Sequence, residues 1–95
     1  MRVRWLSLAL DDLDPLVEYV AQDKPSAAKR VAEAILQAGR RLMEHPAMGR
    51  PGRVMGTREW VIPGTPYIIA YRARDDAVEI LRVLHSAMEW LDELG

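Results

Sequence analysis

Hydrophobic residues follow two different periods along the chain, a helical period in its first half and a strand period in its second. Apolar residues recur every three or four positions from Leu13 to Val20, which predicts an amphipathic helix. Pro15 fits the first turn of a helix better than its interior. This helix therefore begins either at Asp12 as N-cap or earlier, at Ser7, with Pro15 inside; we favour the start at Ser7.

A second helical stripe follows almost at once. Asp23 or Ser26 is expected to cap this helix, Pro25 suits its first turn, and Pro46 lies just beyond its end. Two helices joined by so few residues form an antiparallel helical hairpin. Small residues such as Gly39 would let a neighbouring helix approach closely. The predicted buried stripe consists of Ala28, Val31, Ile35, Leu42 and Met43.

Short strand-like runs surround this hairpin. Val3 to Leu6 alternates apolar and basic residues, and "REWVI", "YIIAYR" and "VEILRVLH" are separated by the turns "PGTP" and "RDDA". The tail "SAMEWLDELG" is expected to form a short helix capped by Ser86. The predicted fold class is α+β, in the order β-α-α-β-β-β(-α), with the helical hairpin packed on a small antiparallel sheet. Residues 1–95 are expected to form one domain.

The predicted register divides the strand residues between two faces of the sheet. The expected pairs are Arg58 with Tyr71, Trp60 with Ile69, Arg72 with Glu79, Ala70 with Leu81 and Ile69 with Arg82. The face expected to meet the helices carries Val61, Ile68, Ala70, Leu81 and Val83. The opposite face carries Arg58, Trp60, Ile62, Tyr67, Ile69, Tyr71, Ile80, Arg82 and Leu84.

This opposite face is apolar and aromatic where a solvated sheet face alternates with polar residues. An exposed patch of that kind usually marks a binding site. The alternative is that the C-terminal helix, with Met88, Trp90 and Leu91, folds back and covers the patch. We expect that helix to cover part of it and to leave the rest for a partner.

Charge is distributed unevenly along the chain. The net charge of −1 argues against a dedicated nucleic-acid binder, so no independent DNA binding is expected. Five acids and no base lie between Asp11 and Asp23, whereas five arginines and one acid lie between Arg40 and Arg58. This asymmetry suggests an acidic partner for one face, although solvated surfaces would also account for it. The early apolar run is too short for a signal peptide or a membrane span, so a cytoplasmic location is expected.

Candidate chemistry is sparse. The chain has no cysteine, which excludes a thiolate nucleophile and a cysteine zinc site. Glu59 and His85 could move protons, but the predicted register puts them on the opposite face from Arg58 and Arg82. No metal cluster, phosphate loop or nucleophilic triad occurs, so neither a cofactor nor a metal is expected. The sequence favours a binding protein over an enzyme.

The order of elements and three stretches carry a resemblance to a known family. They are "ALDDLDPLVEYVAQDKPSAAKRV", "LMEHPAMGRPGRVMGTREWVIPGTPYIIAYR" and "VEILRVLHSAMEW". Over nearly its whole length the chain resembles the ParE branch of the RelE/ParE superfamily, the toxins of bacterial type II toxin–antitoxin pairs. The resemblance implies a hetero-oligomer with an antitoxin whose acidic, partly disordered segment folds on binding. The residues expected to contact antitoxin or target are Arg50, Arg53, Arg58, Trp60, Tyr67, Tyr71, Arg82, Met88 and Trp90.

The resemblance leaves three activities open. ParE-like members inhibit DNA gyrase and trap it with cleaved DNA, and this target is favoured. RelE-like members cleave mRNA on the ribosome, for which Arg58, Arg82 and His85 would be the candidate residues. A third possibility is an attenuated toxin that acts mainly in antitoxin binding and autorepression, since Met88 replaces a basic residue and Leu91 a proline of the ParE pattern.

Overall fold

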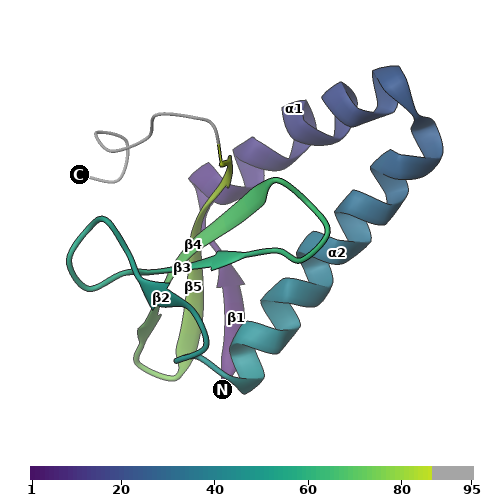
Figure 1. Ribbon diagram of the computed structural model, residues 1–95. Coiled ribbons are helices and arrows are strands. Elements are labelled where there is room, and N and C mark those ends of the chain that lie inside the picture. The colour runs from purple at the N-terminus through teal and green to yellow at the C-terminus, as the bar shows by residue number, and fades with distance from the viewer. Residues whose placement is uncertain (87–95) are drawn as a thin grey trace.

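The computed structural model describes residues 1–86 and shows a helical hairpin lying on one face of a twisted sheet (Figure 1). The elements are β1 (Arg2–Trp5), α1 (Ser7–Asp23), α2 (Pro25–Glu44), β2 (Arg50–Pro51), β3 (Arg58–Val61), β4 (Tyr67–Arg74) and β5 (Ala77–His85). The predicted C-terminal helix lies outside the described residues. The predicted α+β class and element order are confirmed up to β5, with the short strand β2 as an addition.

The hairpin turns at a single residue. Helix α1 begins at Ser7, as favoured, and carries Pro15 in its interior. Lys24 is the C-cap of α1 and the N-cap of α2, with extended backbone angles of φ −144° and ψ 103°. A residue before proline avoids the helical region, so Pro25 fixes the boundary at Lys24. The expectation of a side-chain cap is wrong, because neither Asp23 nor Ser26 occupies the cap position.

The sheet has the strand order β1-β5-β4-β3-β2, and its edge strand β1 runs parallel to β5. The other neighbouring strands pair in the antiparallel sense. The sheet is therefore mixed, whereas an antiparallel sheet was predicted. Strand β1 can lie parallel to β5 because a long stretch of chain, including both helices, separates the two strands.

The register is as predicted between β3 and β4 but shifts partway along β5. Arg58 pairs with Tyr71 and Trp60 with Ile69, as expected. Arg72 also pairs with Glu79, but the pairing slips between Ala70 and Tyr71. The remaining observed pairs at this point are Tyr71 with Ile80, Ala70 with Arg82 and Ile69 with Val83.

This slip is a β-bulge, in which two residues of one strand oppose one residue of its partner. Leu81 is the extra residue, since Ile80 and Arg82 pair with consecutive residues of β4. The predicted pairs of Ala70 with Leu81 and of Ile69 with Arg82 are therefore wrong. Relative to β4, the residues of β5 that follow the bulge therefore lie on the opposite faces from those predicted.

The helices cover the face that was predicted to be open. The main hydrophobic core joins Ile35 and Leu42 of α2 to Ile69, Tyr71 and Ile80 of the sheet, and all five are fully buried. This core also contains Tyr67, Val78 and Val83 of the sheet and Ile62, which directly follows β3, with Trp60 packed against them.

The prediction that Val61, Ile68 and Ala70 face the helices is wrong. Val61 is 42% exposed, and Ala70 belongs to a separate small cluster with Leu84. The face with the larger aromatic and branched side chains removes more apolar area from water when it is covered, which explains why it meets the helices.

The close approach expected at Gly39 occurs, but the neighbour is a strand and not a helix. A Cβ atom at Gly39 would lie 2.8 Å from Cζ2 of Trp5 in β1. The missing side chain thus allows the indole ring to lie against the backbone of α2. This contact anchors the edge strand to the helical layer.

Candidate partner-binding surface

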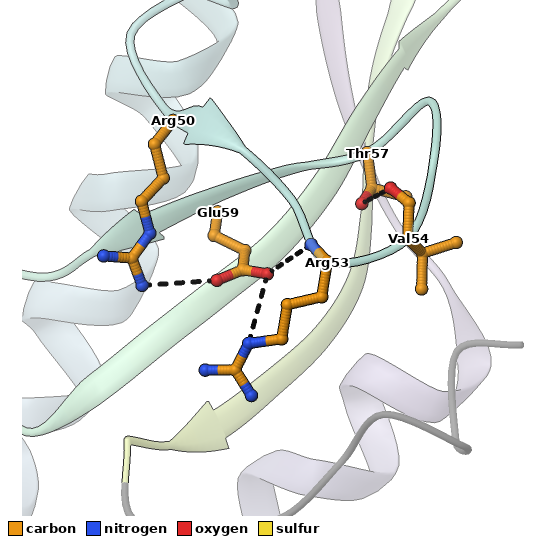
Figure 2. A network of polar contacts seen from close by, with 5 residues as sticks. All are labelled: Arg50, Arg53, Val54, Thr57 and Glu59. Carbon is orange, nitrogen blue, oxygen red and sulfur yellow. Dashed lines mark hydrogen bonds and ion pairs between the residues drawn. The ribbon is translucent and has the colours of Figure 1, made fainter.

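The face of the sheet away from the helices carries a carboxylate held between two arginines. Glu59 of β3 has a side chain that is only 2% exposed. One oxygen, Oε1, lies 3.3 Å from Nη2 of Arg50, and the other, Oε2, accepts a hydrogen bond of 2.9 Å from the backbone N–H of Arg53. Nε of Arg53 lies 3.8 Å from the same Oε2 atom (Figure 2). Glu59 therefore anchors the chain on both sides of Gly52.

The loop that follows is fixed by its own hydrogen bonds. The N–H of Gly52 donates to the carbonyl of Thr57 at 2.8 Å. The Thr57 hydroxyl donates to the carbonyl of Val54 at 2.6 Å, as Figure 2 shows. Gly56 has a φ of +83°, a conformation that costs other residues energy. The tip residue, Met55, is 98% exposed. An apolar side chain is thus presented to solvent by a loop of defined shape.

A second carboxylate on the same face, that of Glu79, also lies between two arginines. Glu79 of β5 accepts a hydrogen bond of 2.7 Å from Nε of Arg72 in β4 and one of 3.3 Å from Nη1 of Arg4 in β1. The hydrogen bond from Arg72 lowers the pKa of Glu79 below its ordinary value, as do the charges of Arg72, Arg4 and Arg74, while burial opposes the shift. Glu79 therefore stays ionised and keeps both guanidinium groups in place.

Strand pairing places the two clusters in one row across the sheet. Arg50 pairs with Glu59, and Glu59 with Ala70 on β4. Arg72 lies two residues further along β4, on the same face, about 7 Å away by strand geometry. The row then continues through the pairs of Arg72 with Glu79 and of Glu79 with Arg4. We call Arg4, Arg50, Arg53 and Arg72, with their two glutamates, the arginine row.

The arginine row has four cations for two anions, so it is net positive. Its arginine side chains are 36–57% exposed, whereas the glutamate side chains are 2% and 9% exposed. The buried carboxylates thus lie beneath the partly exposed guanidinium groups. This arrangement offers guanidinium groups of fixed position to an anionic partner.

Arg82 occupies a different environment, between the sheet and α1. Its Nε and Nη2 atoms donate to the two carboxylate oxygens of Asp12, each at 2.8 Å. Asp12 also accepts a hydrogen bond of 2.8 Å from the backbone N–H of Val83. The side chains of Arg82 and Asp12 are 12% and 14% exposed. The bulge at Leu81 brings Arg82 to this position, where the ion pair joins α1 to β5.

Arg58 and Tyr71 hold the connection between α2 and β2. Nη1 of Arg58 donates to the carbonyl of Gly49 at 2.7 Å. The Tyr71 hydroxyl accepts from the N–H of Gly49 at 2.8 Å and donates to the carbonyl of Pro46 at 2.7 Å. Burial raises the pKa of Tyr71 above its ordinary value, against the opposing effects of the Gly49 hydrogen bond and the Arg58 charge. Both side chains thus contribute to the structure of the connection.

The nine predicted contact residues fall into separate groups. Arg50 and Arg53 come together at Glu59, as described above. The expected exposure of the aromatic residues is wrong: Tyr71 is fully buried, Tyr67 is 6% exposed, and Trp60 packs against the core. Met88 and Trp90 lie outside the described residues. The remaining two, Arg58 and Arg82, make the contacts already given.

The residues proposed for RNA cleavage do not form one constellation. His85 packs edge-on against Tyr67, with ring centroids 5.6 Å apart and an angle of 89° between the planes. Burial, together with the charge of Tyr19, raises the pKa of Tyr67. His85 pairs with Tyr67, whereas Arg58 pairs with Tyr71, four residues along β4. Strand geometry separates such positions by roughly 13 Å.

Sequence reasoning missed the roles of Glu59 and Arg4. Glu59 was considered as an acid or base, whereas it is the buried anchor of two arginines. Arg4 was assigned only to an early strand, because nothing in the local pattern shows that β1 lies beside β5. The cross-strand pair of Arg72 with Glu79 was found correctly from the turn between them.

Residues 1–86 hold neither a metal-binding cluster nor a membrane-spanning helix. Within that range, no group of three or more His, Asp or Glu side chains is arranged to hold a metal ion. No helix in the same range is both long and apolar enough to cross a membrane.

Comparison with known proteins identifies the class of protein to which this fold and site belong. Residues 3–90 match the family described as the ParE toxin of the type II toxin–antitoxin system, parDE. The predicted toxin Y4kP of Sinorhizobium fredii is 48% identical over 89 residues, which cover 94% of this chain and 92% of that protein. The toxin RelE2 of Caulobacter vibrioides is 36% identical over 86 residues, covering 90% and 96%.

A solved structure supports the same assignment. A chain of the chromosomal ParDE system from P. aeruginosa superposes with a TM-score of 0.79 and 26% identity, over 90% of this chain and 95% of that one. The chain described here therefore belongs to the ParE toxin family of type II toxin–antitoxin systems. Membership in this family implies an antitoxin as partner.

Proposed function

We propose that this toxin arrests growth by binding and inhibiting DNA gyrase, and not by catalysing RNA cleavage. The observation that carries the proposal is that the side chains of the three candidate nuclease residues engage different structural partners. Arg58 contacts Gly49, Arg82 contacts Asp12 and His85 contacts Tyr67. Since gyrase works in the cytoplasm, that is where we expect the toxin to act.

General acid–base catalysis needs its groups within about 3 Å of the proton that they transfer. Arg58 and His85 lie two strands apart in the sheet, and their partners on β4 are four residues, roughly 13 Å, apart along that strand. Arg82 is largely buried and makes a two-pronged ion pair with Asp12, an arrangement that stabilises the fold. A guanidinium group engaged in this way is poorly placed to hold a scissile phosphate. These features favour a toxin that acts by binding.

The arginine row supplies the kind of surface that such a toxin needs. Arg50 and Arg53 are expected to contact the target, because their guanidinium groups lie above a buried carboxylate at the solvent-exposed edge of the sheet. Exposed charge pairs are screened by salt. Binding through the row should therefore weaken as ionic strength rises.

A labelling experiment in cells tests the proposal. The toxin is induced without antitoxin, and the synthesis of DNA and of protein is followed by pulse labelling in the same culture. We expect DNA synthesis to fall first while translation continues. A culture that also expresses the cognate antitoxin is the control, and both rates should remain normal there. Translation that stops first, with cut transcripts on ribosomes, would refute the proposal.

The alternative function is a ribosome-dependent mRNA endonuclease. Two relatives carry names of the RelE type: RelE2, and RelE3 at 34% identity over 77 residues. This alternative predicts that His85→Gln abolishes both transcript cutting and growth arrest. A third alternative is an attenuated toxin that serves in autorepression. In that case inducing the chain alone would leave growth unchanged.

A further inference from the structure

A cleft lies where the helical hairpin meets the start of β4 and the end of β5. It consists of two adjoining cavities of about 580 Å³ and 290 Å³, which share the walls formed by Tyr19, Tyr67 and His85. We call this region the tyrosine cleft. Much of its remaining wall is apolar and includes Val20, Val31, Leu16, Pro66, Val83 and Leu84.

Tyr67 brings a hydroxyl group without a protein partner to this wall. The residue is 6% exposed, and its ring packs edge-on against His85. Within residues 1–86 no hydrogen bond involves the Tyr67 hydroxyl, whereas the Tyr71 hydroxyl makes two. Polar groups of buried residues are nearly always hydrogen-bonded. Since Tyr67 lines both cavities, its hydroxyl can bond a ligand that enters the cleft.

The charge around the tyrosine cleft is negative. Asp11 and Asp23 are exposed at its rim, and no ion pair with another described residue engages either of them. Asp12 also lines the cleft but is paired with Arg82. Lys24 is the only lysine or arginine among the described lining residues. A cationic ligand is therefore attracted to the cleft, and a phosphate is repelled.

The aromatic residues favour a planar cation. Tyr19 is 72% exposed, so a ligand can cover its ring. A guanidinium group stacks on aromatic faces and directs five N–H donors outward in its own plane. The Tyr67 hydroxyl can accept from one of these donors, and a carboxylate of the rim can accept from others. An ammonium group has the same charge but lacks the planar shape.

We propose that the tyrosine cleft binds a guanidinium group, which a protein partner presents as an arginine side chain. The guanidinium group donates to the Tyr67 hydroxyl, stacks on Tyr19 and pairs with an aspartate of the rim. The protein target presents the arginine, so this part of the proposal rests on the proposed function. Recognition of the guanidinium group does not depend on it.

An NMR titration of the purified full-length toxin tests this recognition. The probe is Nα-acetyl-L-arginine methylamide, and its citrulline analogue, which has a similar shape but no charge, is the matched control. We expect the arginine probe to shift the resonances of Tyr19, Tyr67 and His85. The citrulline probe should bind at least about fivefold more weakly, because the charge-assisted hydrogen bonds and the cation–π contact are lost.

Tyr67→Phe tests the hydroxyl alone. Affinity for the arginine probe should fall about threefold to tenfold, as expected for the loss of one hydrogen bond. The stability of the free toxin should stay unchanged in denaturant titration, because the hydroxyl has no partner within residues 1–86. Tyr71→Phe is the matched comparison, since it removes a hydroxyl with two hydrogen bonds. That variant should lose stability and keep its affinity for the probe.

A second pair of variants tests the charge of the rim. The double variant Asp11→Asn/Asp23→Asn should weaken binding of the arginine probe and reduce the dependence of that binding on salt concentration. Asp76→Asn is the control, because Asp76 is exposed in the turn between β4 and β5, outside the cleft. Its affinity and salt dependence should match those of the wild type.

The target is tested separately with purified gyrase. Tyr67→Phe should need a toxin concentration about threefold to tenfold higher than the wild type to inhibit supercoiling. Equal inhibition by both proteins would show that the target does not fill the cleft. A wild type that leaves gyrase active would refute the proposed function, whereas the NMR titration would still decide whether the cleft binds a guanidinium group.

Four results would overturn recognition of a guanidinium group by the cleft. The first is equal affinity for the arginine and citrulline probes, which would make the cleft a site for an uncharged group. The second is unchanged affinity in Tyr67→Phe. The third is inorganic phosphate that shifts the same resonances and displaces the arginine probe, which would make the ligand an anion. The fourth is a shift of these resonances on dilution of the toxin alone, which would make a second copy the occupant.

Discussion

On the face of the sheet that α1 and α2 cover, Tyr71, Ile69 and Ile80 are completely buried. On the opposite face, Glu59 and Glu79 lie beneath arginines whose side chains stay at least one-third exposed. Both faces are ordered, but the first depends on removing apolar area from water and the second on pairing charges. The comparison shows that Tyr67 and Tyr71, which were expected to be exposed, belong to the core.

The two faces should therefore respond differently to mutation, pH and salt. Apolar burial changes little with ionic strength, whereas exposed guanidinium groups interact with any anion in solution. A partner can compete for the arginines without disturbing the helical layer. The charged face thus leaves guanidinium groups accessible to anions in solution, whereas the helix-covered face does not.

The largest effect is expected at Tyr71. Tyr71→Ala should lower the free energy of unfolding by about 3–5 kcal/mol, because it removes a fully buried ring. Denaturant titration measures the loss. Tyr71→Phe separates the ring from the hydroxyl, whose two hydrogen bonds to Pro46 and Gly49 would be lost at a cost of about 1–3 kcal/mol. Equal losses in the two variants would contradict the primary role of ring burial.

A smaller effect is expected at Glu59 on the opposite face. Glu59→Ala leaves the N–H of Arg53 without its acceptor and should destabilise the protein by about 1–3 kcal/mol. Hydrogen exchange of the loop between β2 and β3 should accelerate, while that of α1 should not. The control is Glu33→Ala, since Glu33 is exposed on α2. Unchanged exchange in the loop would show that Glu59 does not anchor it.

Alkaline conditions should affect the helix-covered face. Burial raises the pKa of Tyr71, so the neutral phenol is favoured in the folded state. The stability contributed by this shift is fully present below the unfolded pKa of about 10, and it is lost as pH rises through the folded pKa. The free energy of unfolding should therefore decrease more steeply above this pH in the wild type than in Tyr71→Phe. If the unfolding free energies of the wild type and of Tyr71→Phe decreased in parallel, Tyr71 would not be the source of the decrease.

Acid conditions should affect the charged face of the sheet. This is the smallest of the four expected effects. The pKa of Glu79 is lowered chiefly by its hydrogen bond from Arg72. The resulting stability is present above the ordinary glutamate pKa of about 4.3 and is lost as pH falls through the folded value. Arg72→Gln should flatten this decline in unfolding free energy, whereas Arg40→Gln should leave it unchanged. A decline that Arg72→Gln does not alter would rule out the pair as its source.

The sequence was sufficient for features that depend on neighbouring residues. The helix α1 follows from local periodicity, with its start at Ser7 favoured over Asp12, and the pairing of β3 with β4 follows from the turn "PGTP". The pair of Arg72 with Glu79 follows from a short turn in the same way. Each of these predictions needs only a short segment of chain.

Features that depend on distant residues could not be predicted in this way. Alternation shows which residues share a face of a sheet, but it does not show which face the helices cover. The bulge at Leu81 depends on how β5 fits its neighbours, and it moves Arg82 to Asp12, 70 residues earlier. The same holds for the partnership of Arg4 with Glu79, because β1 and β5 come from opposite ends of the described chain.

Supercoiling of relaxed plasmid by purified DNA gyrase, with and without the purified toxin, is the direct test of gyrase inhibition. We expect the toxin to block supercoiling and cleaved DNA to accumulate, and we expect the cognate antitoxin to restore the reaction. Normal supercoiling at toxin concentrations that cut ribosome-bound mRNA in a parallel translation assay would contradict it.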